Sequence, residues 1–503
     1  MKHMMKTILL LGMALMIPCY LFAAGNTLLS PWPLYKRNRL ALCVLTAAFL
    51  CLLLLALRAV GRHEDFLRQH DKSIVVCAAV FYFVVQMIMA HALRFVPKTD
   101  AEQCFTAAQL LCDTGTFGTN ERSFVYFTRY PHNLGMVYLL AGIFRFFGLF
   151  GWADRYMQAA VVCTLLFTLG LVCAARSARR MGGEKAQARM LILFLSSLPL
   201  LYCTSELYTD AFSVSFPMVI VYCFLRAKEA EGAKPRALWA LLFGLAAFIG
   251  AQIRFTAVIA AIACLIALAF ERRGRALAAA ALALVAAFVL GGAAMDAFTY
   301  RHLSREDIER YELPKLHYIA MGLPIHEDEG YGQYGDGGWL IFTTSFEDTQ
   351  ERDAALLSEV IDRVYYLRYP SRLVNMLSRK LLSTFGTGTF MLNEIIEADD
   401  YDADNAVKQV IFGRGRFSRA YYHIATALFA AQMIIACLAC AQAVRRRNTA
   451  AAPLFIALVG VFLFLCMWES RGRYFFQFVP TLLCAGAMLD VCSLKGGRGR
   501  QKP

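Results

Sequence analysis

Charged residues are scarce in this chain of 503 residues, since Asp, Glu, Lys and Arg make up only 17% of it. A soluble domain carries about 25%. Hydrophobic residues make up 58%, a balance that excludes a soluble enzyme, a disordered chain and a disulfide-stapled secreted fold. The sequence also has no GxxxxGKS/T loop, no GxSxG elbow and no HExxH helix, so the common motifs of soluble catalysis are absent.

Long apolar runs define the fold class. A bilayer core of roughly 30 Å needs about 20 apolar residues per helix, and the chain contains about twelve runs near that length. They predict an all-α polytopic membrane protein. The first run resembles a signal peptide, but no clear small-residue cleavage site follows it, so we expect a retained helix. The expected spans are 7–24, 40–58, 74–95, 156–175, 190–205, 208–226, 237–253, 255–270, 276–298, 421–444, 452–468 and 475–492.

The positive charge is unevenly distributed. The chain has 51 basic and 37 acidic residues, a net charge of +14. Residues 299–420 hold 14 basic and 20 acidic residues, a net of −6, so the remainder holds 37 and 17, a net of +20. This excess lies in short loops between apolar runs, which is the positive-inside pattern and excludes a nucleic-acid face. The loops expected on the cytoplasmic side, together with both termini, are 58–72, 176–189, 226–236, 271–275, 445–447 and 495–502.

The opposite face then receives four segments, 96–154, 204–210, 299–420 and 468–473. One loop violates the charge rule, because Lys36, Arg37 and Arg39 would lie outside. The arrangement requires that the apolar stretch 134–150 lies in the outer interface and does not span, with Pro131 in its first turn. We expect four parts: an N-terminal hairpin with its loop (1–73), a membrane core (74–298), a mixed extracytoplasmic loop domain (299–420) and C-terminal helices with a basic tail (421–503).

Most of the 16 cysteines lie in apolar runs. Cys437 and Cys440 form a CxxC, but inside a hydrophobic helix, where small packing residues are the favoured interpretation. Cys104 and Cys112 are too far apart on one helix for a disulfide, at roughly 12 Å.

The chemistry is expected where the spans meet the outer loops. Asp100 and Glu102 directly follow the third span. Thr99-x-x-Glu102 also reads as a capping box, with Asp100 at the first helical position, so capping competes with a catalytic role. Asp210, in the tight turn Ser205 to Asp210, similarly reads first as a helix cap.

Basic and aromatic side chains share these loops. Arg471 and Arg473 lie on the outer side against the usual charge bias, and Arg254 lies between two spans at the same face. Guanidinium groups match phosphate oxygens, which suggests an anion site; pairing with outer carboxylates is the alternative. Arg129 and His132 flank Tyr130-Pro131, either as a turn with an interfacial aromatic anchor or as a polar cluster facing Asp100. His317 precedes a Gly/Tyr segment, 330–338, that is either a surface loop or a cover for substrate.

These segments, in this order, resemble the GT-C glycosyltransferase superfamily, and within it the bacterial protein-mannosyltransferase and aminoarabinose-transferase group. The resemblance covers about residues 100 to 475. The motifs that carry it are Thr99-Asp100-Ala101-Glu102, Tyr130 to Gly135 (YPHNLG), Tyr208-Thr209-Asp210, His317 to Leu323 (HYIAMGL) and Glu469 to Tyr474 (ESRGRY).

The resemblance implies a hexosyl- or pentosyltransferase of the plasma membrane. It would move a sugar from a polyprenyl-phosphate carrier to an envelope acceptor, a glycolipid, glycan or protein, at the outer face. Asp100 is the expected base, with Glu102 as the second catalytic acid. No cofactor is required, although a divalent cation held by Asp100, Glu102 and Asp210 is an alternative. The expected substrate-binding residues are Arg129, His132, Asp210, Arg254, His317, Glu469, Arg471 and Arg473.

The chemistry agrees with this implication. A lipid-phosphate leaving group needs cations but no general acid, and the acceptor hydroxyl needs a base. A hydrolase would instead need two carboxylates across the sugar bond. Two other functions remain open: a lipid-linked glycan transporter or flippase, which would place charges near the membrane midplane, and a surface-glycan polymerase, ligase or scaffold.

Overall fold

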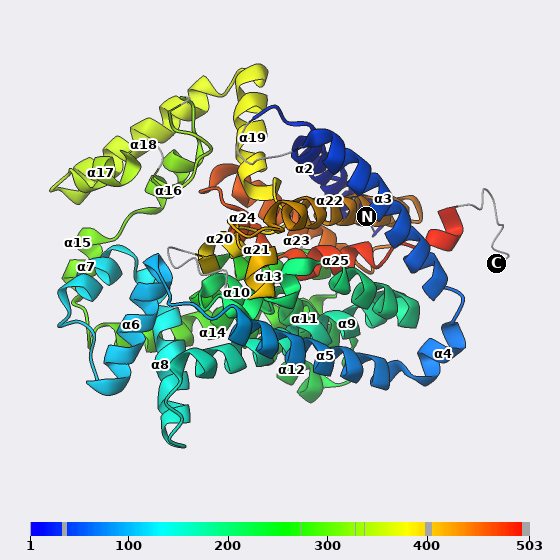
Figure 1. The fold of residues 1–503 in the computed structure, drawn as a ribbon, viewed down its shortest axis with the longest axis horizontal. Helices are drawn as coiled ribbons and strands as arrows, with labels where there is room; N and C mark the ends of the chain where they lie inside the picture. The colour runs from blue at the N-terminus through cyan, green and yellow to red at the C-terminus, as the bar shows by residue number, and fades with distance from the viewer. Residues whose placement is uncertain are drawn as a thin grey trace.

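The computed structural model describes residues 2–32, 38–271, 273–326, 328–335, 338–397 and 405–494. Within these ranges the chain is helical and forms no strand. The all-α prediction is therefore confirmed, and the described residues of the loop domain are helices and turns as well. Figure 1 shows a bundle of long helices, with several shorter helices gathered at one end of it.

Among the described residues, eight helical segments are long and apolar enough to cross a membrane. Two shorter apolar segments, η4–α13 (Phe255–Glu271) and α23 (Ala452–Met467), pack beside them. The eight are α1–α2 (Lys2–Ala14 and Met16–Leu29), α3 (Arg39–Val60), α5 (Asp71–Ala92), α9 (Arg155–Leu195), α10–α11 (Thr209–Ser213 and Phe216–Glu229), α12 (Ala233–Ile253), α14 (Gly274–Thr299) and α22 (Ser418–Arg445).

Two further expected spans, 190–205 and 475–492, are divided into short helices and turns. The expected loop 176–189 is helical on both sides of Gly183, whose φ of +76° reverses the chain, a conformation that glycine adopts at low cost. The span expected at 190–205 is the end of α9 followed by two short turns, η2 (Leu198–Leu201) and η3 (Cys203–Ser205). The span expected at 475–492 is divided among α24 (Gly472–Phe476), α25 (Val479–Gly486) and η6 (Val491–Leu494).

Ion pairs join the basic loops at one end of the bundle. Asp71, at the start of α5, lies 2.7 Å from Arg176 and also pairs with Arg179. Lys228 lies 2.6 Å from Glu271, which joins the loops before α12 and before α14. Four of the loops assigned to one face by their charge are therefore joined in two pairs, 58–72 with 176–189 and 226–236 with 271–275. Lys36, Arg37 and the basic tail 495–502 are outside the described residues, and Arg39 begins α3.

The opposite end carries the expected outer segments. α6 (Thr99–Asp113), α7 (Glu121–Arg129), η1 (Pro131–Asn133) and α8 (Leu134–Gly148) form a compact unit in which α8 packs on α6. α8 is not among the helices of membrane length, as its prediction required, and Pro131 opens the turn before it.

The loop domain continues at this end as α15 (Arg305–Tyr311), α16 (Lys315–Gly322), α17 (Trp339–Thr344), α18 (Thr349–Tyr366) and α19 (Pro370–Phe385). The helical segment is interrupted between α18 and α19 at Pro370, which lacks an N–H and disfavours a helical residue before it. Two short helices, α20 (Leu392–Glu397) and α21 (Ala406–Ile411), lead back to α22.

The CxxC cysteines pack inside the bundle. Both are buried in α22, and the Cys440 thiol donates to the Met13 carbonyl of α1 at 3.1 Å. None of the 16 cysteines forms a disulfide, so this pair packs helices as interpreted from the sequence.

Candidate active site

Four charged side chains from four distant segments meet at the loop-rich end of the bundle. Arg473, in α24, places Nη2 3.7 Å from Oδ2 of Asp100 and Nη1 3.6 Å from Oδ2 of Asp210. Arg254, which ends α12, pairs with the other oxygen of Asp210. Two guanidinium groups and two carboxylates therefore form one continuous cluster.

Asp100 is the accessible carboxylate of this cluster. Its side chain is 41% exposed, whereas that of Asp210 is fully buried. Asp100 sits in the first turn of α6, and Thr99 before it has a φ of +53°, a conformation that costs energy in a residue with a β-carbon and that concentrates at functional sites. The backbone strain lies at the residue that orients Asp100.

A chain of hydrogen bonds holds the Asp100 carboxylate. The Tyr126 hydroxyl donates to its Oδ1 at 3.0 Å, and Asn133 Nδ2 donates to the Tyr126 oxygen at 2.8 Å. The Tyr208 hydroxyl in turn donates to Asn133 Oδ1 at 3.1 Å. Tyr126, Asn133 and Tyr208 were not assigned roles from the sequence, although two of them lie inside the motifs YPHNLG and YTD.

The capping interpretations of the two acidic turns are both wrong. At α6 the N-cap is Lys98, with no side-chain cap bond. Glu102 does not reach the site, because both of its carboxylate oxygens accept from Arg122, at 3.0 and 3.2 Å. At α10 the residue before the helix is Tyr208, also without a side-chain cap bond.

Glu206 serves the first turn of α10 in place of Asp210. Its Oε2 accepts from the Ala211 N–H at 3.1 Å, and its side chain is fully buried beside Asp210. Burial, reinforced by the Asp210 charge, raises the pKa of Glu206 to about 8. A carboxyl four residues before Asp210 was visible in the sequence, but nothing there indicated that both side chains turn inward.

The two arginines of the motif ESRGRY point in different directions. Arg473 faces the acids, whereas Arg471 Nη2 donates to the Tyr334 carbonyl at 3.3 Å. Glu469 Oε1 accepts from the Tyr334 N–H at 3.2 Å and lies 3.9 Å from Arg471 Nε. The Ser470 N–H donates to Gly332. The segment Glu469 to Tyr474, called the arginine turn below, therefore holds the Gly/Tyr segment in place. Among the described residues, no hydrogen bond or ion pair joins Arg471 to Asp100.

Aromatic rings line the approach between that segment and α6. Tyr130 and Tyr334 share a hydrogen bond of 2.6 Å between their hydroxyls. Tyr318 stacks on Trp468 with ring centres 5.1 Å apart. His132 is exposed and meets Tyr130 and Tyr318 edge-on, with ring centres 6.1 and 6.3 Å away. Rings of this kind provide flat apolar surfaces next to polar handles.

Two of the expected substrate-binding residues lie apart from the cluster. His317 is buried in the loop domain, where its Nδ1 lies 2.7 Å from Thr343 Oγ1. Arg129 is partly buried at the end of α7, and its carbonyl accepts from Leu313 N–H. Neither side chain contacts the described acids of the site. The structure brings together Asp100, Asp210, Arg254 and Arg473, with His132, Glu469 and Arg471 around them.

Lys380 is a buried cation that the sequence did not reveal. It lies on α19 with no exposed surface, and its Nζ donates to the carbonyls of Gly322 and Trp468. Burial lowers the pKa of Lys380 to about 7. Lys380 thereby ties the end of α16 to the residue that precedes the arginine turn.

Unsatisfied polar atoms concentrate around the site. Among the described residues, thirteen buried side-chain nitrogen or oxygen atoms have no hydrogen-bond partner. Seven of them belong to the segments around the site: Ser205, Glu206, Asp210, Tyr318, Ser470, Arg471 and Arg473. Buried polar groups are normally paired, so this concentration is typical of a site built to bind a polar ligand.

The three carboxylates considered as metal ligands do not converge. Arg473 lies between Asp100 and Asp210, and Glu102 faces Arg122. No cluster of three His, Cys, Asp or Glu side chains suited to a metal occurs in the described ranges.

A cavity of about 520 Å³ lies beside the α5–α6 junction, and the four charged residues of the cluster are not among its lining residues. Its lining includes Pro97 and Phe105, on either side of Asp100 in the chain, and the apolar side chains of Phe95 and Val96. Arg94 and Arg155 add charge to its wall, each paired with a carboxylate, Asp154 and Asp113.

Among solved structures, the chain is similar to ArnT from Cupriavidus metallidurans, bound to undecaprenyl phosphate and in the apo state. With the bound form the identity is 15% and the TM-score 0.36, over 82% of this chain and 77% of that one. With the apo form they are 15% and 0.34, over 83% and 78%. No curated protein matches the sequence. The family described as conserved hypothetical integral membrane protein matches residues 2–493. The chain therefore belongs to that family of integral membrane proteins.

Proposed function

We propose that this protein is a membrane glycosyltransferase that moves a sugar from a polyprenyl-phosphate carrier to an envelope acceptor at the extracytoplasmic face. The observation that carries the proposal is the cluster in which Arg473 lies between an exposed and a buried carboxylate, with Arg254 beside it. Such a cluster offers a base for a hydroxyl and cations for a phosphate in one place.

Asp100 is the proposed base. The acceptor oxygen attacks the anomeric carbon, the bond from that carbon to the phosphate oxygen breaks, and the acceptor proton passes to Asp100. The result is inversion by direct displacement. Asp210 is unsuited to this role, because it is fully buried and engaged by two guanidinium groups; it positions the arginines.

Arg473 and Arg254 are the proposed phosphate ligands. The leaving group carries its negative charge away as a stable phosphate, so guanidinium groups stabilise it better than an acid would. Tyr474 holds Arg254 with the guanidinium 4.7 Å from the ring centre. The apolar residues that line the cavity beside the α5–α6 junction suit a polyprenyl chain, and the rings of Tyr130, Tyr318 and Tyr334 suit a sugar.

The positions of the charges argue against the transporter alternative. Asp100 follows the end of α5, Asp210 precedes α11 and Arg254 ends α12, so the ionisable groups lie at helix ends. A transporter of polar cargo places such groups near the middle of its spans. A polymerase or ligase would use the same phosphate contacts, so the identity of the acceptor distinguishes it.

The test is transfer in membranes supplied with a panel of polyprenyl-phosphate sugars. We expect Asp100→Asn to lose transfer by at least about 10²-fold while the folded protein still binds the donor. Glu102→Gln is the matched control, because that carboxylate pairs with Arg122 outside the cluster, and it should keep most activity. Near wild-type transfer by a folded Asp100→Asn protein would remove the proposed base. We also expect transfer to persist in EDTA.

A further inference from the structure

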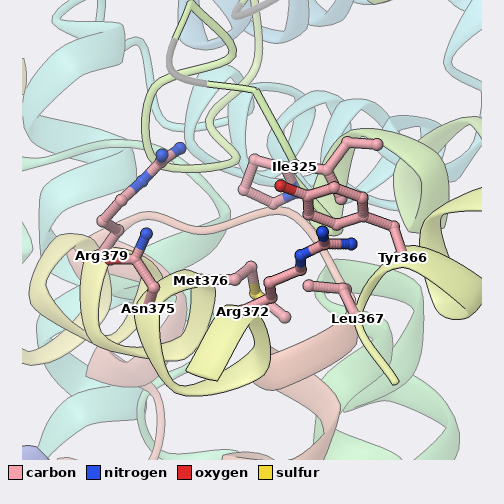
Figure 2. A pocket seen from close by; sticks show the side chains of 8 residues that line it. Ile325, Tyr366, Leu367, Arg372, Asn375, Met376 and Arg379 are labelled. Atoms are coloured by element: carbon pink, nitrogen blue, oxygen red, sulfur yellow. The ribbon is translucent and has the colours of Figure 1, made fainter. Parts of the chain in front are cut away.

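A second polar pocket lies in the loop domain. Figure 2 shows it between the start of α19 and the segment that follows α16, with Arg372 and Arg379 on its two sides. Its cavity of about 40 Å³ holds roughly three water molecules, which suits a phosphate group and excludes a whole sugar. The lining residues are Pro324, Ile325, Tyr366, Leu367, Arg372, Asn375, Met376 and Arg379.

The pocket has two guanidinium groups and no carboxylate. Arg379 is buried, and its Nη2 donates to the His326 carbonyl at 3.2 Å and to the Gly330 carbonyl. Arg372 is exposed and stacks on Tyr366 and Tyr369, with ring centres 4.1 and 4.7 Å from its guanidinium carbon. Neither makes an ion pair with any described acid. A buried cation without a counter-charge is costly, which favours an anionic ligand.

Two contacts place the pocket beside the end of the first apolar helix. α19 packs on the end of the first apolar helix, since Asn26 Nδ2 donates to the Ser378 carbonyl at 2.6 Å. Arg379 lies over the ring of Trp32, 5.7 Å from its centre, and tryptophan is enriched at membrane interfaces.

The surface of α19 next to the pocket is apolar. Leu373 and Val374 are exposed there, Val374 at 52%, directly after Arg372. Exposed aliphatic side chains beside arginine and tyrosine are typical of a helix that rests in the headgroup region. Leu373 and Val374 therefore offer an apolar surface next to the pocket.

We propose that this pocket binds the phosphate of an anionic lipid headgroup in the leaflet on the side of the candidate active site. Arg372 and Arg379 would bind the phosphate oxygens, and Asn375 would donate a further hydrogen bond. The apolar flank of α19 would contact the acyl chains. This site is separate from the glycosyl-transfer cluster, and the proposal does not depend on that function.

The test uses the full-length protein in nanodiscs of phosphatidylglycerol and phosphatidylcholine, with native mass spectrometry of the lipids retained after release. We expect wild type to retain phosphatidylglycerol preferentially. Arg372→Gln should lower that retention by about tenfold, as expected for the loss of one charged hydrogen-bond donor, and Arg372→Lys should lower it less. Arg310→Gln is the matched control, because Arg310 also lies over an exposed tyrosine ring, that of Tyr311, in the same domain, and it should retain lipid like wild type.

Three results would overturn the proposal. Equal retention of both lipids by wild type would exclude a site selective for net anionic headgroups. An equal loss of phosphatidylglycerol retention in the Arg372→Gln and Arg310→Gln proteins would show that retention depends on surface charge and not on the pocket. Inorganic phosphate that raises Tm in lipid-free detergent as much as phosphatidylglycerol does, in wild type but not in Arg372→Gln, would assign the pocket to a soluble phosphate.

Discussion

Arg473 Nη2 lies 3.7 Å from Asp100 Oδ2, although the two residues are far apart in the sequence. The α5–α6 junction delivers the acid and the short helix α24 delivers the guanidinium. This contact sets a carboxylate that faces solvent beside a cation held from behind by buried Asp210.

Replacing Arg473 should damage transfer more than binding of the acceptor. We expect Arg473→Gln to lower kcat/KM for the lipid-phosphate donor by about 10²- to 10³-fold, the usual cost of removing one charge-stabilising donor. Arg473→Lys should recover part of the lost kcat/KM, because the lysine ammonium still supplies a positive point charge. Initial rates at varied donor concentration measure this, and an unchanged donor dependence in Arg473→Gln would contradict it.

Tyr126→Phe should lower kcat by about tenfold with little change in KM, because it removes the hydrogen bond that orients Asp100. Its control is Tyr365→Phe on α18, whose ring is 64% exposed. Equal rates for the two variants would show that Tyr126 does not position the base.

The donor KM should rise by several-fold between about pH 7.5 and pH 9, since Glu206 ionises near its pKa of about 8. The new charge beside Asp210 then competes with phosphate for Arg254 and Arg473. Glu206→Gln carries no such charge and should show a flat profile over this range. The same rise in both proteins would assign the titration to another group.

Lys380 should make the protein more stable as the pH rises from about 7 to about 10. The pKa of Lys380 in the folded protein, about 7, lies below its value of about 10.4 in the unfolded chain. In this pH window the unfolded chain therefore binds more protons than the folded protein, and the free energy of unfolding rises as the pH rises. Tm in detergent should therefore rise with pH more in wild type than in Lys380→Met, with exposed Lys315→Met as control. Parallel Tm profiles for wild type and Lys380→Met would exclude this titration.

The sequence predicted the segments of the site better than their contacts. Hydropathy and charge located the ends of α5, α11 and α12, and hence Asp100, Asp210 and Arg254. The sequence could not show which of the two carboxylates, Asp100 or Glu102, reaches the site, because this depends on the tertiary ion pair between Glu102 and Arg122. The buried Lys380 likewise depends on how α19 packs. The break at Pro370 was readable from the proline rule alone, whereas the reversal at Gly183 looked like an ordinary loop glycine.

The balance of the four-residue cluster has a genetic consequence. Asp100, Asp210, Arg254 and Arg473 sum to zero formal charge, and all but Asp100 are largely shielded from water. Neutralising any one of the three shielded residues leaves an unpaired charge buried away from water, whereas neutralising one acid and one arginine together keeps the cluster neutral. The double variant Asp210→Asn, Arg254→Gln should thus fold better than either single variant. Such second-site suppression would identify which acid and which arginine compensate each other's charge.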